Sequence, residues 1–225
     1  MKDFFVIGAT GSMGVGTSTM SNILGEDFGF PIFSADKAVH KMYAPGGEAV
    51  EPVGAAFPEA FIDGGIDSDA LFDVILGDPE RWSQLDKIVH PLVKKAALAF
   101  LDEQREKGAP VAILDVPLLY EAGLDGLCDI TLCSSAPFDE QRRRVLERPN
   151  MTEEKFRALL ARQMNDDKKR GRADHVVPTG TSLAETKEFL RTLFTELGLL
   201  NEKSQPRLTG SGVSCARDKL TKTTL

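Results

Sequence analysis

A glycine-rich segment near the N-terminus of this 225-residue chain carries the residue types best suited to bind phosphate groups. The segment, residues 8–19, contains four glycines and ends in three hydroxyl residues: Gly8, Gly11, Gly14, Gly16, Thr17, Ser18 and Thr19. Glycine readily takes positive φ, so successive backbone N–H groups can point to one side of a turn. A helix that begins behind such a turn adds the partial positive charge of its N-terminus. The segment therefore predicts an anion-binding loop.

Two nucleotide-binding templates fit this segment. The span from Gly11 to Ser18 follows the nucleotide-triphosphate loop, G-x-x-x-x-G-K-[ST], at every position except the lysine, where Thr17 stands. The spacing of Gly8, Gly11 and Gly14 also follows a dinucleotide-binding turn. The segment alone does not decide between the two templates.

An acid further along the chain, Asp36, bears on this choice. It lies 22 residues beyond Gly14, and a dinucleotide-binding fold also places an acid at about that distance for a ribose hydroxyl. Short-chain dehydrogenases with this glycine pattern, however, need a tyrosine followed four residues later by a lysine. The two tyrosines, Tyr43 and Tyr120, are followed at that distance by a glycine and a leucine. Hydride transfer is therefore disfavoured.

Short apolar runs predict the strands of a parallel sheet around the loop. These runs are 4–7, 31–36, 111–119, 130–133 and 175–177. Because the ligands of such sheets bind beyond the carboxyl ends of the strands, Asp115 is placed near the loop, where an acid can hold Mg²⁺ directly or through water. The alternative is that Asp115 only caps a turn or a helix.

Residues 37–107 show helical periodicity and no clear strand. Residues 45–47 break the chain, and Pro91 is expected to open a long helix that reaches Phe100. The block is too long for a simple crossover, so we interpret it as a helical insertion that adds a substrate site. Helices that merely cover one face of the sheet are the alternative.

Charge is unevenly distributed along the chain, whose net charge is −7. Residues 1–139 carry 9 basic and 22 acidic side chains, whereas residues 140–174 carry 11 basic and 7 acidic ones. We expect helices at 138–148, 152–163 and 183–197, with Thr152 as the N-cap of the second. The basic segment has the right size to close over a polyphosphate, and a solvated helical hairpin is the alternative.

The composition, with 42% hydrophobic and 27% charged residues, is that of a globular protein. No apolar run approaches the ~18–20 residues of a membrane span, and we expect neither a signal peptide before the first predicted strand nor a membrane partner. Three cysteines without metal spacing, Cys128, Cys133 and Cys215, favour a reducing compartment, the cytoplasm. Residues 201–225 are predicted to be a disordered tail. We expect no nucleic acid partner, and the oligomeric state stays open, with a monomer favoured.

Several further segments make the sequence resemble one family, dephospho-coenzyme A (dephospho-CoA) kinase, over about residues 4–197. The segments that agree are the loop, Ala35-Asp36, His90-Pro91, Asp115-Val-Pro-Leu-Leu119, Gln141-xx-Arg144-xxx-Arg148 and the span from Ala161-Arg-Gln163 to Arg172-Ala-Asp174. The resemblance implies a three-layer α/β/α fold of the P-loop class with a parallel sheet. It assigns 1–36, 108–137 and 173–200 to a nucleotide-binding core, 37–107 to a helical substrate-binding insertion and 138–172 to a helical lid.

The family transfers the γ-phosphoryl group of ATP to the ribose 3′-hydroxyl of dephospho-CoA, the last step of coenzyme A synthesis. The resemblance therefore implies ATP, Mg²⁺ and dephospho-CoA as ligands. Loop residues would hold the phosphates: Gly11, Ser12, Met13, Gly14, Val15, Gly16, Thr17, Ser18 and Thr19. Ser18 and Asp115 would bind Mg²⁺, and Asp36 would accept the proton of the 3′-hydroxyl. Arg144 and Arg148 would reach over the phosphates when the lid closes.

The resemblance also implies substrate contacts, at Asp36, His90, Asp115 and Leu118. For His90 an alternative stays open, in which it and Pro91 only cap and orient the long helix.

The sequence departs from the family pattern at positions close to the expected chemistry. Thr17 replaces the loop lysine that normally bridges the β and γ phosphates, and Ser34, Ser68 and Pro178 stand where the family often has aspartate, arginine and aspartate. Losing one donor aimed at the charge that develops in the transition state costs on the order of 10²–10³ in rate.

We therefore expect a dephospho-CoA kinase whose activity could be reduced. The alternative is a family member that binds nucleotide or CoA without efficient turnover. Other nucleoside kinases and shikimate-type kinases fit less well, because those families lack the 90–91 and 115–119 segments.

Overall fold

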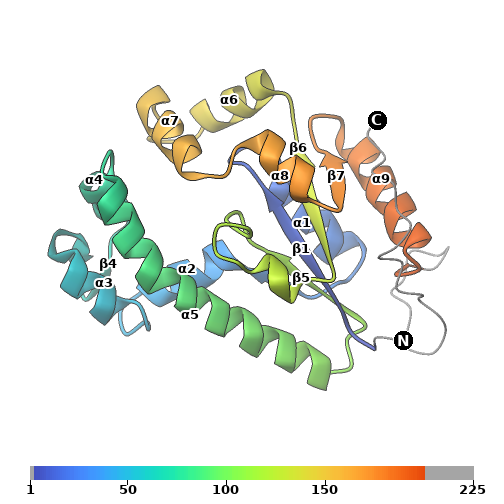
Figure 1. The fold of residues 1–225 in the computed structure, drawn as a ribbon, viewed down its shortest axis with the longest axis horizontal. Helices are drawn as coiled ribbons and strands as arrows, with labels where there is room; N and C mark the ends of the chain where they lie inside the picture. The colour runs from blue at the N-terminus through green and yellow to red at the C-terminus, as the bar shows by residue number, and fades with distance from the viewer. Residues whose placement is uncertain (1–2, 201–225) are drawn as a thin grey trace. The chain divides into compact units, whose positions relative to one another are not determined.

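The computed structural model describes residues 3–200, which fall into two compact units (Figure 1). The first, here called the sheet unit, comprises residues 3–33 and 101–200. The second, here called the helical unit, is Ser34–Phe100. The predicted tail at 201–225 lies outside the described residues.

A five-stranded sheet forms the centre of the sheet unit, with strand order β2-β5-β1-β6-β7. The strands are β1 (Phe5–Gly11), β2 (Ile32–Ser34), β5 (Val111–Asp115), β6 (Ile130–Ser135) and β7 (His175–Pro178). The pairs β1–β5, β1–β6 and β6–β7 are all parallel. The five predicted strand positions are confirmed, although the run predicted to reach 119 leaves the sheet after Asp115.

One face of the sheet is covered by helices from both ends of the chain. These are α1 (Thr17–Asn22), its π-helical continuation η1 (Ile23–Asp27) and α9 (Leu183–Glu196). Their apolar side chains form one core with alternate strand residues such as Ile7 and Leu132. The rings of Phe28, Phe30 and Phe194 pack together, with centroids 5.4–6.3 Å apart. This packing anchors the helix that follows the glycine-rich loop.

The opposite face is covered by the segment after β5 and by α8 (Asp166–Arg172). Tyr120 donates to Thr131 at 3.2 Å, and Thr131 donates to Asp174 at 2.9 Å. Burial raises the pKa of the Cys133 thiol on this face to about 12, and that of Cys128 to about 12 as well. Neither thiol is therefore suited to act as a nucleophile near neutral pH.

The basic segment folds into three helices: α6 (Phe138–Leu146), α7 (Glu153–Arg162) and α8. Thr152 caps α7, as predicted, by accepting from the Lys155 N–H at 3.2 Å. The sequence patterns predicted only the first two of these helices, and α8 was not predicted. The last helix, α9, begins at a capping box formed by Ser182 and Glu185.

The helical unit contains α2 (Ala35–Tyr43), α3 (Val50–Ala56), a 3₁₀ turn η2 (Pro58–Ala60), α4 (Ser68–Ile75) and most of α5 (Pro79–Glu106). A second 3₁₀ turn, η3 (Asp125–Leu127), belongs to the sheet unit.

The expectation of no strand in 37–107 is wrong, because β3 (Phe61–Ile62) and β4 (Gly65–Ile66) pair as a hairpin. Its turn residues, Asp63 and Gly64, both have positive φ, at 51° and 79°. An Asp-Gly pair is the hairpin signal that the helical interpretation overlooked.

The predicted helix start at Pro91 is also wrong, since Pro91 lies inside α5. The helix starts at Pro79, where the Asp78 carboxylate accepts from the N–H groups of Glu80 and Arg81 at 2.9 and 3.1 Å. Proline is favoured at a first helical position because its missing N–H has no acceptor there. An interior proline removes one helical hydrogen bond, which flanking apolar contacts in a 28-residue helix can offset. None of the helices within 3–200 is long and apolar enough to cross a membrane.

Candidate active site

The glycine-rich loop connects β1 directly to α1. Gly14 and Gly16 have φ of 79° and 97°, which side chains with a Cβ rarely adopt. A Cβ on Gly16 would lie 3.0 Å from the Thr179 Cβ, and one on Gly11 would lie 2.5 Å from the Thr17 Oγ1. The Thr17 hydroxyl therefore points back toward the end of β1, and the loop closes tightly around its own glycines.

Several backbone N–H groups of the loop have no acceptor within residues 3–200. They belong to Gly14, Gly16, Thr17, Ser18 and Thr19. The first intrahelical bond runs from the Met20 N–H to the Gly16 carbonyl at 3.1 Å. N–H groups without acceptors at the start of a helix suit an anion, which they can bind together with the positive end of the helix dipole.

Thr179 holds the far side of this loop. Its N–H donates to the Ser135 carbonyl at 2.8 Å, and its hydroxyl bonds to the carbonyls of Val15 and Ser135. The Thr179 carbonyl accepts from both Nη atoms of Arg144 at 3.1 Å each. The end of β6, the loop and α6 are therefore joined at one residue.

Arg144 lies beside the loop, and three of its five N–H donors are engaged there. A Cβ on Gly16 would lie 3.3 Å from the Arg144 Nη1. The Arg144 Nε donates to Glu140 at 2.7 Å. Arg148 is exposed and makes no ion pair or side-chain hydrogen bond with the rest of residues 3–200. Of the two predicted arginines, Arg148 is thus the one whose guanidinium has all its donors available.

Asp115 lies at the same end of the sheet as the loop. It is in register with Ala9, two residues before Gly11, and the next residue, Val116, donates its N–H to the Ala9 carbonyl at 2.9 Å. Its side chain is half-buried. A strand-end carboxylate next to a phosphate loop is suited to bind a divalent cation together with a nucleotide.

A family model for dephospho-CoA kinase matches residues 5–185 of this chain. The chain belongs to the dephospho-CoA kinase family. A relative from Agrobacterium fabrum, named dephospho-CoA kinase, is 42% identical over 193 residues, which cover 86% of this chain and 98% of that protein. These matches confirm the resemblance that was inferred from the sequence motifs.

Solved structures show the same fold. TT1252 from Thermus thermophilus superposes with a TM-score of 0.70 at 33% identity, covering 87% of this chain and 99% of that one. A shikimate kinase from Acinetobacter baumannii, solved with shikimate, has a TM-score of 0.51 at 16% identity, over 86% of this chain and 94% of that one. The second likeness concerns the fold alone. The predicted P-loop α/β fold is thereby confirmed.

The other residues predicted from the family pattern are divided between the two units. Leu118 is half-buried in the segment after β5. Asp36 and His90 belong to the helical unit. Asp36 is exposed at the second position of α2, behind the N-cap Ser34, and the His90 Nε2 lies 3.4 Å from the Asp86 Oδ1. Their contacts with substrate stay predictions.

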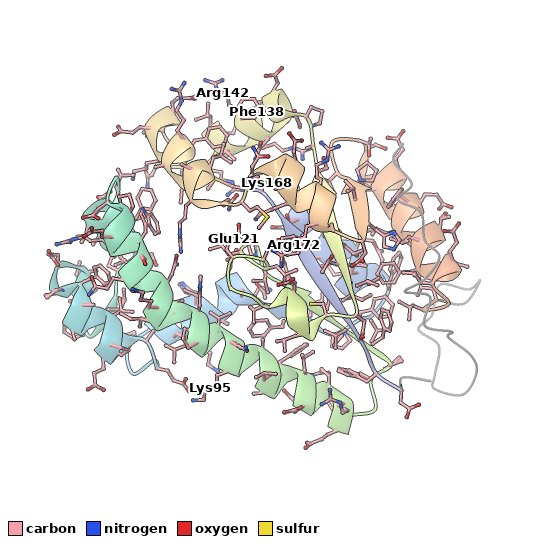
Figure 2. The ribbon with its side chains drawn as sticks, viewed as in Figure 1. Lys95, Glu121, Phe138, Arg142, Lys168 and Arg172 are labelled. Carbon is pink, nitrogen blue, oxygen red and sulfur yellow. The ribbon has the colours of Figure 1, made fainter. Side chains whose placement is uncertain are left out.

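Sequence reasoning missed a buried lysine next to the loop. Lys169 of α8 has no exposed surface, and its Nζ donates to the Pro117 carbonyl at 2.6 Å and lies 3.2 Å from the Glu121 Oε1. The hydroxyl of Thr10, at the end of β1, donates to the same carbonyl at 3.1 Å. Figure 2 shows the labelled Glu121 close to α8. Lys168, which precedes Lys169 in this helix, is exposed. No spacing rule distinguishes these two lysines in a basic segment.

The second missed residue is Asp166, which also contacts the loop. The buried Ser12 hydroxyl donates to the Asp166 Oδ1 at 2.8 Å. An acid at the start of α8 is expected to cap its own helix, yet the capping side chain here is Asn165, which accepts from the Asp167 N–H. Asp166 therefore places a negative charge beside a loop whose N–H groups suit an anion.

We predict that Asp166→Asn tightens binding of ATP·Mg²⁺ roughly threefold to tenfold, because a nearby like charge is removed. The asparagine Oδ1 still accepts from Ser12, so the loop keeps its contact. Calorimetric titration measures the Kd, and Asp167→Asn, one residue along and 88% exposed, is the matched control. Equal Kd values for the two variants would contradict the prediction.

Proposed function

We propose that this protein transfers the γ-phosphoryl group of ATP to the ribose 3′-hydroxyl of dephospho-CoA, giving coenzyme A and ADP. The observation that carries the proposal is the loop, whose N–H groups lack acceptors within residues 3–200, in a chain of the dephospho-CoA kinase family. The backbone N–H groups from Ser12 to Ser18, apart from those of Met13 and Val15, which already have acceptors, would cradle the β and γ phosphates, with the positive end of α1 behind them.

Mg²⁺ fits the donors available in the sheet unit. Protein-bound Mg²⁺ in kinases usually takes one or two protein oxygens and completes its shell with phosphates and water. The Ser18 hydroxyl at the start of α1 and the Asp115 carboxylate at the end of β5 are oxygens of this kind. When bound with ATP, the ion would neutralise charge on the phosphates.

Asp36 is proposed as the residue that accepts the proton of the 3′-hydroxyl. In the step, a bond forms between the 3′-oxygen and the γ-phosphorus, and the bond to the oxygen that bridges the β and γ phosphates breaks. The electron pair leaves with ADP, and the hydroxyl proton passes to the Asp36 carboxylate. Arg144 and Arg148 would stabilise charge on the transferring group.

The remaining assignments follow the family pattern. We assign 1–36, 108–137 and 173–200 to nucleotide binding, 37–107 to the dephospho-CoA site with His90 and Leu118, and 138–172 to a lid. We expect the reaction to take place in the cytoplasm, where ATP is available, without a nucleic acid or membrane partner, and we favour a monomer.

A coupled assay tests the proposal. With ATP, Mg²⁺ and dephospho-CoA we expect ADP to form and the acceptor to gain one phosphoryl group, as read by mass spectrometry. Coenzyme A is the matched control acceptor, because its 3′-oxygen is already phosphorylated, and it should give no turnover. ADP formation that does not depend on dephospho-CoA would contradict the assignment of the acceptor.

A further inference from the structure

Both polar groups of one loop residue are held by glutamine side chains. The Met13 N–H donates to the Gln163 Oε1 at 2.9 Å, and the Met13 carbonyl accepts from the Gln141 Nε2 at 2.7 Å. Gln141 lies in α6 and is 5% exposed, whereas Gln163 directly follows α7. Two separate parts of the basic segment therefore form hydrogen bonds with the same residue of the loop.

The two glutamines have opposite roles, which the backbone itself fixes. A backbone N–H can only donate and a carbonyl can only accept, so Gln163 must present its oxygen and Gln141 its nitrogen. Neither contact adds charge. The pair can therefore orient the loop without changing the electrostatic potential at the phosphate site.

The residue that follows, Gly14, is packed against the same helix. A Cβ on Gly14 would lie 3.0 Å from the Gln141 carbonyl oxygen, and φ at Gly14 is 79°. The orientation of the Met13 carbonyl is the orientation of the peptide plane that also carries the Gly14 N–H. Holding that carbonyl thus sets the direction of the Gly14 N–H, which has no acceptor within residues 3–200.

We propose that Gln141 and Gln163 are positioning residues for the nucleotide, holding the Met13 backbone so that the loop N–H groups are directed before ATP binds. The inference rests on the proposed use of ATP. A preorganised loop binds its ligand more tightly than one that must be ordered on binding. Loss of the contact should therefore raise the Kd and KM for ATP, with little change in kcat at saturating ATP or in the KM for dephospho-CoA.

The opposite roles allow a charge-matched test. Gln163→Glu keeps an acceptor for the Met13 N–H, whereas Gln141→Glu removes the donor to the Met13 carbonyl and sets two oxygens against each other. Both variants add one negative charge near the loop, so the charge effect is shared. We expect the Kd for ATP·Mg²⁺ to be about tenfold higher in Gln141→Glu than in Gln163→Glu. Equal values, or a weaker Gln163→Glu, would overturn the proposal.

Gln141 is buried, so its glutamate variant could fail to fold. The variants Gln141→Met and Gln163→Met then take the place of the two glutamate variants, because methionine has a similar length but no amide group. Each should raise the Kd for ATP, and thermal unfolding checks that each variant is folded. Unchanged Kd values in both folded variants would refute the role in positioning.

Amide exchange in the nucleotide-free protein separates this inference from the proposed function. The Met13 N–H should exchange slowly in the unaltered protein and in Gln163→Glu, and faster in Gln163→Met. If the unaltered protein binds no ATP, the proposed function fails, whereas this exchange pattern still supports the hydrogen bond between Gln163 and the Met13 N–H. Fast exchange in the unaltered protein would show that Gln163 does not hold the loop.

Discussion

Replacing Thr17 by lysine should raise kcat by about 100-fold or more, the scale of one restored donor aimed at transition-state charge. The threonine hydroxyl is a single neutral donor on a short side chain. It also points back toward Gly11, close to the end of β1. A lysine at this position of a nucleotide-triphosphate loop reaches the β and γ phosphates.

The structure argues against compensation by the neighbouring arginines. Arg143 pairs with Glu140 and Glu147, and Arg142 pairs with Glu153. Hydrogen bonds from Arg143, and to a lesser degree from Arg144, lower the pKa of the Glu140 carboxyl to about 2, so this partner stays ionised at neutral pH. Of the four arginines at positions 142, 143, 144 and 148, the first three are therefore bonded to acids or to the Thr179 carbonyl.

Steady-state kinetics with saturating ATP·Mg²⁺ and dephospho-CoA measure the gain. Thr17→Met, which matches much of the length of lysine without its charge, is the control and should give no gain. A gain of only a few-fold, together with near-complete loss of activity in Arg144→Ala, would show instead that the lid supplies the missing charge. A folded Thr17→Lys with no gain at all would refute this account of the loop.

Asp36→Asn should lower kcat by at least about 100-fold while leaving the Kd for ATP nearly unchanged. The carboxylate is proposed to act on the acceptor hydroxyl, and general-base catalysis is commonly worth 10²–10⁴ in rate. Asparagine has nearly the same shape but no useful basicity. The kinetic constants and a calorimetric Kd for ATP give the two parts of this prediction.

A matched variant for this test is Asp69→Asn. Asp36 and Asp69 are both exposed acids in the first turn of a helix of the helical unit. Asp69→Asn should keep the kcat of the unaltered protein. Turnover retained in Asp36→Asn would show that another group accepts the proton.

Local sequence patterns predicted most of the fold because they report on single elements. Apolar runs marked the five strands, and the glycines marked the loop, since positive φ at Gly14 and Gly16 has a direct residue signature. The helix start at Pro91 failed because Pro79 carries the same signature and has the Asp78 cap as well. A pattern of this kind marks both prolines as helix starts, but it does not show which of the two begins the helix.

The parts of the site that escaped prediction depend on contacts between distant segments. Lys169 meets Pro117 across 52 positions, and Ser12 meets Asp166 across 154. Gln141 and Gln163 lie in segments that match the family, but nothing in their spacing shows that both contact the loop. Helix propensity and spacing describe neighbours along the chain, so they carry no information on which polar side chain meets which peptide group.

The adjacent lysines of α8 form a natural pair of chemical probes. Lys168 is exposed, whereas Lys169 has no exposed surface. An amine-acylating reagent reaches Lys168 in every molecule, but it reaches Lys169 only in those molecules whose α8 has opened from the sheet. The ratio of acylation at the two positions, read from one peptide, therefore measures how often that helix opens.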